Sequence, residues 1–185
     1  MKSALVIYNK MTALDFIGFY DPYTRLKSMH FIEDFSWDVC SYTKTVHDDR
    51  GMLFTPTKIK KPLDNYDLIY VPGGYGMYDL ITNKSFLNWI KTGENCKYKI
   101  SACTGSLILG AAGFINGKKA TTHHLEYNRL EHYNATISKE RIVDEGDIIT
   151  AGGVSAAIDL GLYMVKKLAG EDAYWEIKKQ MEYNG

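Results

Sequence analysis

The sequence predicts one α/β domain with a mainly parallel sheet. Short apolar runs rich in β-branched residues alternate with longer segments of helical periodicity, which is typical of parallel strands joined by helices. Of the 185 residues, 45% are hydrophobic, 24% are charged and 4 are proline, so the chain can bury a full core without disulfides or a structural metal. It contains no internal repeat or linker, and we expect residues 1–185 to form a single domain.

Five short apolar segments, each bounded by turn residues, are expected to form strands. In chain order they are residues 4–8, 37–42, 68–71, 99–102 and 148–151. Six other segments have the apolar spacing of helices: residues 14–27, 85–92, 104–112, 125–132, 155–168 and 172–183. Gly113 and Gly170 follow two of these helices, where a C-cap is expected. Residues 43–61 carry a few apolar side chains among polar ones and predict a β-hairpin outside this pattern.

The charge balance argues against polyanionic partners. The 22 Lys and Arg residues equal the 22 Asp and Glu residues in number, so no net positive charge favours nucleic acid or an anionic membrane. The longest nearly unbroken apolar stretch, residues 107–115, is far shorter than the roughly 20 residues that cross a bilayer. The N-terminus has no signal-peptide pattern, and the three cysteines form no Cys-x-x-Cys motif. We therefore expect a cytoplasmic protein without disulfides or a zinc site.

Cys103 stands where a predicted strand runs directly into a helix. Only small side chains surround it, at Ser101, Ala102 and Gly105, which is the pattern of a nucleophile elbow. The free N–H groups at a helix start favour a thiolate and lower the pKa of a cysteine, and the N–H of Thr104 would serve as an oxyanion donor. A small buried cysteine without a chemical function is the alternative, and the pattern by itself leaves both interpretations open.

A glycine-rich loop follows another predicted strand. Gly73, Gly74 and Gly76 either allow the backbone to approach a ligand closely or form a plain turn, and their spacing is not a dinucleotide-binding fingerprint. Because the carboxyl ends of parallel strands gather at one edge of a sheet, we expect this loop to lie near Cys103.

Asp15 lies near the start of the first predicted helix. With Thr12 three residues before it, the pattern is that of a capping box, and these residues alone favour that structural role. The functional alternative is a carboxylate that follows the first strand, faces Cys103 and handles protons.

Several blocks of the sequence occur in an order that resembles a known family. They are residues 14–18, 72–74, 101–113 with 116–123, and 152–159. The block around Cys103 closely resembles the nucleophile block of the ThiJ/PfpI superfamily, most of all its isocyanide hydratase branch. The resemblance covers nearly the whole chain and implies a flavodoxin-like, glutamine-amidotransferase-like three-layer sandwich. It also implies that Cys103 is the nucleophile, that Asp15 faces it, and that Thr104 helps to shape the site.

The resemblance further implies an enzyme that adds water to an isocyanide. Cys103 would attack the terminal carbon while Asp15 delivers a proton, and water would then release an N-substituted formamide from the covalent thioimidate. This chemistry needs no metal or other cofactor, and the amides of Gly73, Gly74 and Thr104 are the expected electrostatic partners. Because Asp15 must take both protonation states, we expect burial to raise its pKa. The expected partners are a small-molecule substrate and a second copy of the chain in a homodimer.

Some positions depart from the family pattern. Thr104 stands where protease-like members carry His, and the missing Cys–His pair disfavours peptidase chemistry. His123 matches a His near the family's site and is expected to be a hydrogen-bonded neighbour or an interface residue rather than a catalyst. His124 and Ala157 stand where the hydratases usually carry Trp and Gly, which alters the expected pocket.

Other functions remain alternatives. Cys103 could serve a redox or stress response by oxidation to a sulfinic acid, or the domain could bind a ligand without catalysis, although we expect no DNA-binding segment beside it. Amidase or glyoxalase-like chemistry is a further possibility, but Asp15 is one methylene shorter than the Glu usual in glyoxalase-like members. The aromatic candidates for an apolar pocket are Tyr20, Tyr23 and Tyr75.

Overall fold

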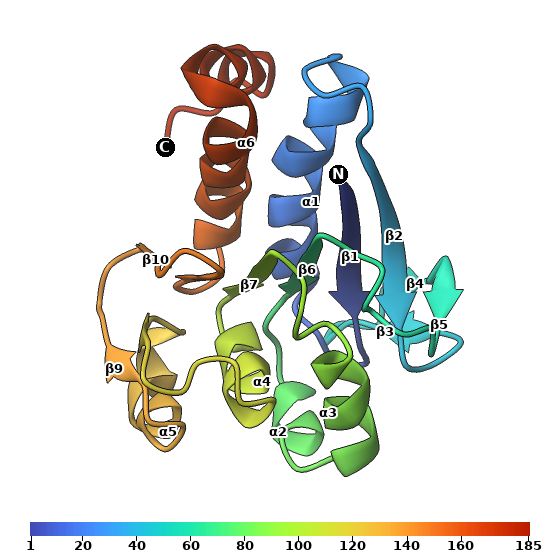
Figure 1. Cartoon of the computed structure of the whole chain (residues 1–185), viewed down its shortest axis with the longest axis vertical. Coiled ribbons are helices and arrows are strands. Elements are labelled where there is room, and N and C mark those ends of the chain that lie inside the picture. Colours follow the sequence, from blue (N-terminus) through green and yellow to red (C-terminus); the bar gives the residue numbers. More distant parts are fainter.

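A seven-stranded sheet forms the middle of the protein, whose computed structural model describes residues 1–185 (Figure 1). The strand order is β10-β11-β7-β6-β1-β2-β5, and all neighbours are parallel except β10 and β11. The strands are β1 (Lys2–Ile7), β2 (Ser36–Ser41), β5 (Lys58–Ile59), β6 (Leu68–Val71), β7 (Tyr98–Ala102), β10 (Ile142–Asp144) and β11 (Ile148–Ala151). The continuously apolar runs of β1 and β6 lie in the middle of the sheet, where both faces are covered.

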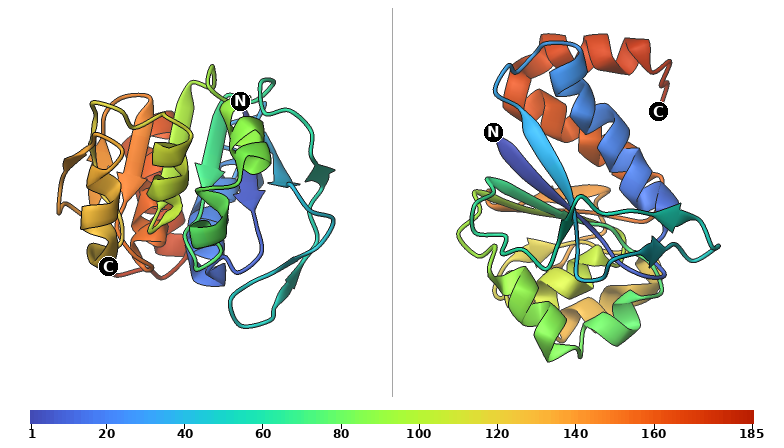
Figure 2. Two further views of the ribbon diagram at one scale, coloured as in Figure 1. Left: turned by 90° about the horizontal axis from the view of Figure 1, so that it is seen from below. Right: turned by 90° about the vertical axis from the view of Figure 1, so that its right-hand side faces the viewer.

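Helices cover both faces of this sheet (Figure 2). On one face α1 (Ala13–Ser28) and α6 (Ala156–Gln180) pack against each other. The shorter helices lie on the other face: α2 (Met77–Leu80), α3 (Lys84–Lys91), α4 (Gly105–Ala111), a 3-10 turn (His124–Glu126) and α5 (Tyr127–Glu131). The predicted α/β sandwich of three layers is therefore confirmed.

The predicted strands and helices are all present, with ends that differ by a few residues. Gly170 has a left-handed φ of 89° and interrupts α6 between its two predicted parts. The sequence did not predict α2, β10, or the paired strands β8 (Lys119–Ala120) and β9 (Thr136–Ile137), because such short elements show no periodicity.

The predicted hairpin is confirmed within residues 43–61. Strands β3 (Val46–His47) and β4 (Leu53–Phe54) pair antiparallel in a separate two-stranded sheet. The chain then returns as β5, which pairs in parallel with β2 and forms one edge of the main sheet. This return to the sheet was not expected from the sequence.

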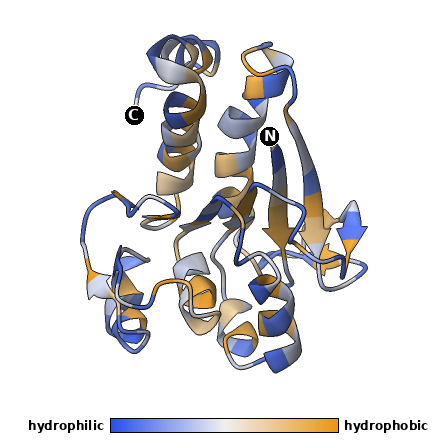
Figure 3. Cartoon of the chain, viewed as in Figure 1, coloured by the Kyte–Doolittle hydropathy of each residue, from blue (hydrophilic) through white to orange (hydrophobic).

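The hydrophobic core contains 45 buried residues and reaches the start of α1. Figure 3 shows hydrophobic residues concentrated along the strands and on parts of the helices. The ring of Tyr70 on β6 stacks on Phe19 of α1 at 3.9 Å between centroids, and its hydroxyl donates to the carbonyl oxygen of Asp15 at 2.5 Å. Packing of the core therefore fixes the position of Asp15. None of the helices combines the length and hydropathy needed to span a membrane.

Candidate active site

Cys103 sits in a strained turn between β7 and α4. Its φ of 53° lies in the left-handed region, which costs a residue with a side chain about 1–3 kcal/mol. Four hydrogen bonds hold this conformation. The Cys103 N–H donates to the carbonyls of Ala151 and Gly152 at 3.0 and 2.9 Å, and its carbonyl accepts from the hydroxyls of Ser106 and Thr122, both at 3.1 Å. The backbone thus has the sharp strand-to-helix geometry that the sequence predicts.

The glycine loop lies directly against this turn. A Cβ atom on Gly73 would fall 2.7 Å from the Cβ of Cys103 and 2.8 Å from Oδ2 of Asp15, so only glycine fits between them. Gly74 has a φ of 135°, and a Cβ there would fall 2.4 Å from the Cα of Met11. The three loops that follow β1, β6 and β7 therefore meet at one point, as expected for parallel strands.

Asp15 is fully buried and does not form the predicted capping box. The side chain of Thr12 makes no hydrogen bond to the first turn of α1, and its hydroxyl instead contacts Oδ2 of Asp49 at 3.4 Å. Both carboxylate oxygens of Asp15 are buried and make no hydrogen bond of ordinary geometry, and Oδ2 lies beside Gly73. The capping interpretation was wrong because the first turn of α1 directs this carboxyl inward, next to Cys103.

Burial controls the protonation of the Asp15 carboxyl and the Cys103 thiol. It raises the pKa of Asp15 to about 7, although the Cys103 thiol and the Gly73 amide lower it in part. Burial and the neighbouring charge of Asp15 also raise the pKa of the Cys103 thiol. The expectation of a lowered cysteine pKa was wrong, since the Thr104 N–H and the start of the seven-residue helix α4 do not offset desolvation. Asp15 and Cys103 therefore titrate as a coupled pair. The pair loses its first proton near neutral pH and keeps its second proton to much higher pH.

The expected backbone donors are partly engaged within the protein. The N–H of Gly74 donates to Oγ1 of Thr104 at 2.9 Å, so the expectation that Gly74 offers a free amide does not fit this geometry. The Gly73 N–H faces the carboxyl of Asp15, and the Thr104 N–H faces the sulfur of Cys103. The N–H of Thr104 therefore faces the Cys103 sulfur, and its hydroxyl oxygen accepts a hydrogen bond from the glycine loop.

Replacing Thr104 by valine is expected to destabilise the protein by about 1–3 kcal/mol, because the buried Gly74 N–H loses its acceptor. Valine has nearly the same shape, so the change isolates the hydroxyl. Urea unfolding of Thr104→Val beside Thr104→Ser, which keeps the acceptor, measures this loss. Equal stability of the two variants would contradict the role of this hydrogen bond.

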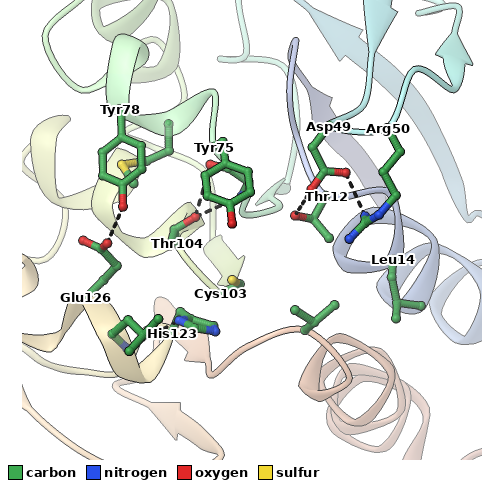
Figure 4. A pocket seen from close by; sticks show the side chains of 14 residues that line it. Thr12, Leu14, Asp49, Arg50, Tyr75, Tyr78, Cys103, Thr104, His123 and Glu126 are labelled. Carbon is green, nitrogen blue, oxygen red and sulfur yellow. Dashed lines mark hydrogen bonds and ion pairs between the residues drawn. The ribbon is translucent and has the colours of Figure 1, made fainter.

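A pocket of about 360 Å³ opens over Cys103, whose side chain points into it (Figure 4). It is lined by Thr12, Leu14, Asp49, Arg50, Gly74, Tyr75, Met77, Tyr78, Cys103, Thr104, His123, Leu125, Glu126 and Val154. Half of these residues are hydrophobic, which suits a small organic ligand. Asp15 does not line the pocket and lies in the buried layer next to Cys103.

Only one of the three tyrosines predicted for the pocket lies there. Tyr75 lines it and is exposed, whereas Tyr20 packs on Trp37 and the Tyr23 hydroxyl bonds to Ser3 within the core. The sequence missed Tyr78, whose hydroxyl donates to Glu126 across the pocket wall. Aromatic residues in one helix show the same spacing whether they face a core or a pocket, so no sequence signal separated them.

Other residues near the site were also missed. Asp49 and Arg50 come from the turn of the β3–β4 hairpin, which the sequence predicted without assigning it a function. Tyr8 and Tyr70 are buried beside the pair, and burial together with the charges of Asp15 and Cys103 raises their pKa values. Both phenols are therefore neutral at physiological pH.

His123 forms part of the pocket wall. A Cβ on Gly153 would fall 2.3 Å from its Cδ2, and its Nδ1 accepts the Leu125 N–H at 3.4 Å. Burial and the neighbouring ring of His124 lower its pKa, and it makes no hydrogen bond to Cys103. No group of three or more His, Cys, Asp or Glu side chains is placed to hold a metal ion.

Comparison with known proteins agrees with this architecture. Isonitrile hydratase from Pseudomonas putida is 32% identical over 187 aligned positions, which cover 99% of this chain and 78% of that protein. A ThiJ/PfpI family protein from Pseudomonas syringae superposes with a TM-score of 0.91 at 29% identity, covering 100% of this chain and 75% of the other. Schizosaccharomyces pombe DJ-1 has the same fold, with a TM-score of 0.79 at 20% identity and 98% of each chain covered. Residues 1–167 match the DJ-1/PfpI family, and we conclude that the chain belongs to it.

Proposed function

We propose that this protein is an isocyanide hydratase that converts R–N≡C and water into an N-substituted formamide. The observation that carries the proposal is the pairing of a strained Cys103 with the buried carboxyl of Asp15 beneath a half-apolar pocket. The similarity to isonitrile hydratase from Pseudomonas putida supports the same reaction.

In the first step the sulfur of Cys103 attacks the terminal carbon of the isocyanide. A new S–C bond forms, and the carbon receives a proton by way of Asp15, whose pKa of about 7 lets it both carry and release one. The product is a thioimidate, S–CH=N–R, that contains every atom of the isocyanide and the thiol. The Thr104 N–H, which faces the sulfur, stabilises negative charge there while the bond forms.

In the second step water adds to the thioimidate carbon. Asp15, which took up the thiol proton in the first step, gives a proton to the nitrogen and accepts the proton of the attacking water as the tetrahedral adduct forms. Cleavage of the S–C bond then returns the thiol and releases the formamide. The cycle therefore ends with the pair in its starting protonation state.

The pocket suits the organic substituent of such a substrate. Leu14, Leu125 and Val154 provide aliphatic surface in the wall of the pocket, and Tyr75 adds an aromatic ring. An isocyanide group is compact, so its carbon can approach the sulfur while the substituent stays in the apolar part of the pocket.

The other functions have less support from the site. Cys103 is 5% exposed and burial raises the pKa of its thiol, whereas readily oxidised sensor cysteines are exposed thiolates. Peptidase or amidase chemistry generally pairs the cysteine with a histidine, and His123 makes no hydrogen bond to Cys103.

Incubation of the purified protein with cyclohexyl isocyanide tests the proposal. We expect N-cyclohexylformamide to accumulate, detected by mass spectrometry, at a rate proportional to protein concentration. A Cys96→Ala variant serves as a control, because Cys96 is equally buried but lies outside the pocket. If neither cyclohexyl nor aromatic isocyanides yield a formamide above the rate in buffer, the hydratase assignment is wrong.

A further inference from the structure

The β3–β4 hairpin is fixed to the segment that leads into α1. The Lys10 N–H donates to the His47 carbonyl at 2.7 Å, and the His47 N–H donates to Oδ1 of Asn9 at 2.9 Å. The Asp49 N–H donates to the Met11 carbonyl at 2.9 Å. The turn of the hairpin thereby lies beside residues 9–12, immediately before the helix that carries Asp15.

The same segment is joined to the glycine loop on its other side. The Thr12 N–H donates to the Gly73 carbonyl at 2.9 Å, and the Gly76 N–H donates to the Lys10 carbonyl at 3.1 Å. The hairpin turn, residues 9–12 and the glycine loop therefore form one hydrogen-bonded unit that ends next to Cys103.

Asp49 brings a mostly buried negative charge into this unit. Its side chain is only 9% exposed, and its carboxylate accepts from the Thr12 hydroxyl at 3.4 Å and from the Arg50 guanidinium at 2.8 Å. Arg50 is 74% exposed, so water screens its positive charge more strongly than the charge of Asp49. Figure 4 shows both side chains at the pocket with Thr12 beside Asp49. The reaction steps above do not use this carboxylate.

We propose that Asp49 is a positioning residue for the Cys103–Asp15 pair. Its carboxylate accepts from the hydroxyl of Thr12 at the start of α1, and its negative charge adds to burial in favouring the protonated form of Asp15. The inference rests on the proposed function in one respect, since the retained proton is the one that the isocyanide receives.

Among the charged groups around the Cys103–Asp15 pair, Asp49 is the one that affects the pKa of Asp15. The titratable and charged groups that face the pair from the elements packed around it are Tyr8, Tyr70, Asp49, Arg50, His123 and Glu126. Both tyrosines and His123 are neutral at pH 7, because burial raises the pKa of the phenols and lowers that of the imidazole. Glu126 is paired with Arg129 at 2.8 Å. The charge of Asp49 is the one that raises the pKa of Asp15, in addition to burial.

The pH profile of Cys103 alkylation tests this role. Iodoacetamide modification, located by peptide mass spectrometry, reports the first ionisation of the pair without any isocyanide. Asp49→Asn keeps an oxygen that accepts from Thr12 but removes the charge. We expect this variant to move the midpoint to lower pH, because a negative charge that raises the pKa of Asp15 is gone. Asp15→Asn should lack this transition, which assigns the midpoint to the pair.

Arg50→Gln is the matched control for the direction in which the alkylation midpoint moves. Removing its positive charge leaves Asp49 uncompensated, so we expect a smaller shift to higher pH. An unchanged midpoint in folded Asp49→Asn, or shifts of both variants in the same direction, would overturn the proposal. If Asp49→Asn fails to fold, the direction of the Arg50→Gln shift decides. Opposite shifts in a protein that makes no formamide would uphold the role of Asp49 and reject the hydratase function alone.

Discussion

Replacing Cys103 by alanine is expected to lower kcat/KM for isocyanide hydration by at least about 10³-fold. The sulfur forms the covalent bond to the substrate, and no other nucleophilic side chain lies at its position in the pocket. Serine at the same position should be equally inactive, because a hydroxyl is a much weaker nucleophile toward the soft isocyanide carbon. The measurement is the initial rate of formamide formation across a range of substrate concentrations.

The fold should survive this change. Alanine keeps the Cβ that packs against Gly73, and the four backbone hydrogen bonds of the turn do not involve the sulfur. Circular dichroism and thermal unfolding of Cys103→Ala beside the wild type verify this, and Cys40→Ala controls for loss of a buried cysteine elsewhere. Residual activity of Cys103→Ala within tenfold of the wild type would contradict covalent catalysis at this residue.

Replacing Asp15 by asparagine is expected to abolish hydration and to stabilise the protein at pH 8. The activity should fall by roughly 10²–10⁴-fold, since an amide cannot carry the proton. The stability gain follows from burial of the carboxylate, which disfavours its ionised form more than the contacts with Cys103 and Gly73 favour it. The rise of its pKa from 3.8 to about 7 lowers the free energy of unfolding at pH 8 by about 4 kcal/mol. We expect Asp15→Asn to restore roughly 2–4 kcal/mol of this loss, because the asparagine amide is also buried.

The pH dependence of this gain has a definite sign. Below pH 3.8 Asp15 is protonated in both the folded and the unfolded chain and costs nothing. Between pH 3.8 and about 7 the unfolded chain releases the proton while the folded chain keeps it, so wild-type stability falls as pH rises. Urea unfolding of wild type and Asp15→Asn from pH 4 to pH 8 measures the difference. A gain that does not grow with pH would show that the carboxyl is not the cause.

The central part of the fold could be predicted from the sequence because the signals there are local. Continuous apolar runs such as β1 and β6 predict buried parallel strands, and the small residues around Cys103 predict a sharp turn. Strands of two or three residues, such as β8 and β10, carry too few side chains to show a period. Their pairing depends on distant parts of the chain.

The errors at the site have a common physical origin. A Thr-x-x-Asp pattern fits a capping box, but the space at Gly73 and the contact of Thr12 with Asp49 decide where the carboxyl of Asp15 points. A helix start suggests a lowered cysteine pKa, but the depth of burial of Cys103 is a tertiary property. The same limit applies to Asp49, which reaches the pocket only through the folding of the hairpin.

Rapid-mixing mass spectrometry of the intact protein with one equivalent of cyclohexyl isocyanide tests the central claim most directly. We predict a transient species heavier by the mass of the whole isocyanide, located at Cys103 by peptide mapping, that forms before the formamide and decays as the formamide appears. Formamide production without any adduct on Cys103, or an adduct that persists while no formamide forms, would contradict the mechanism.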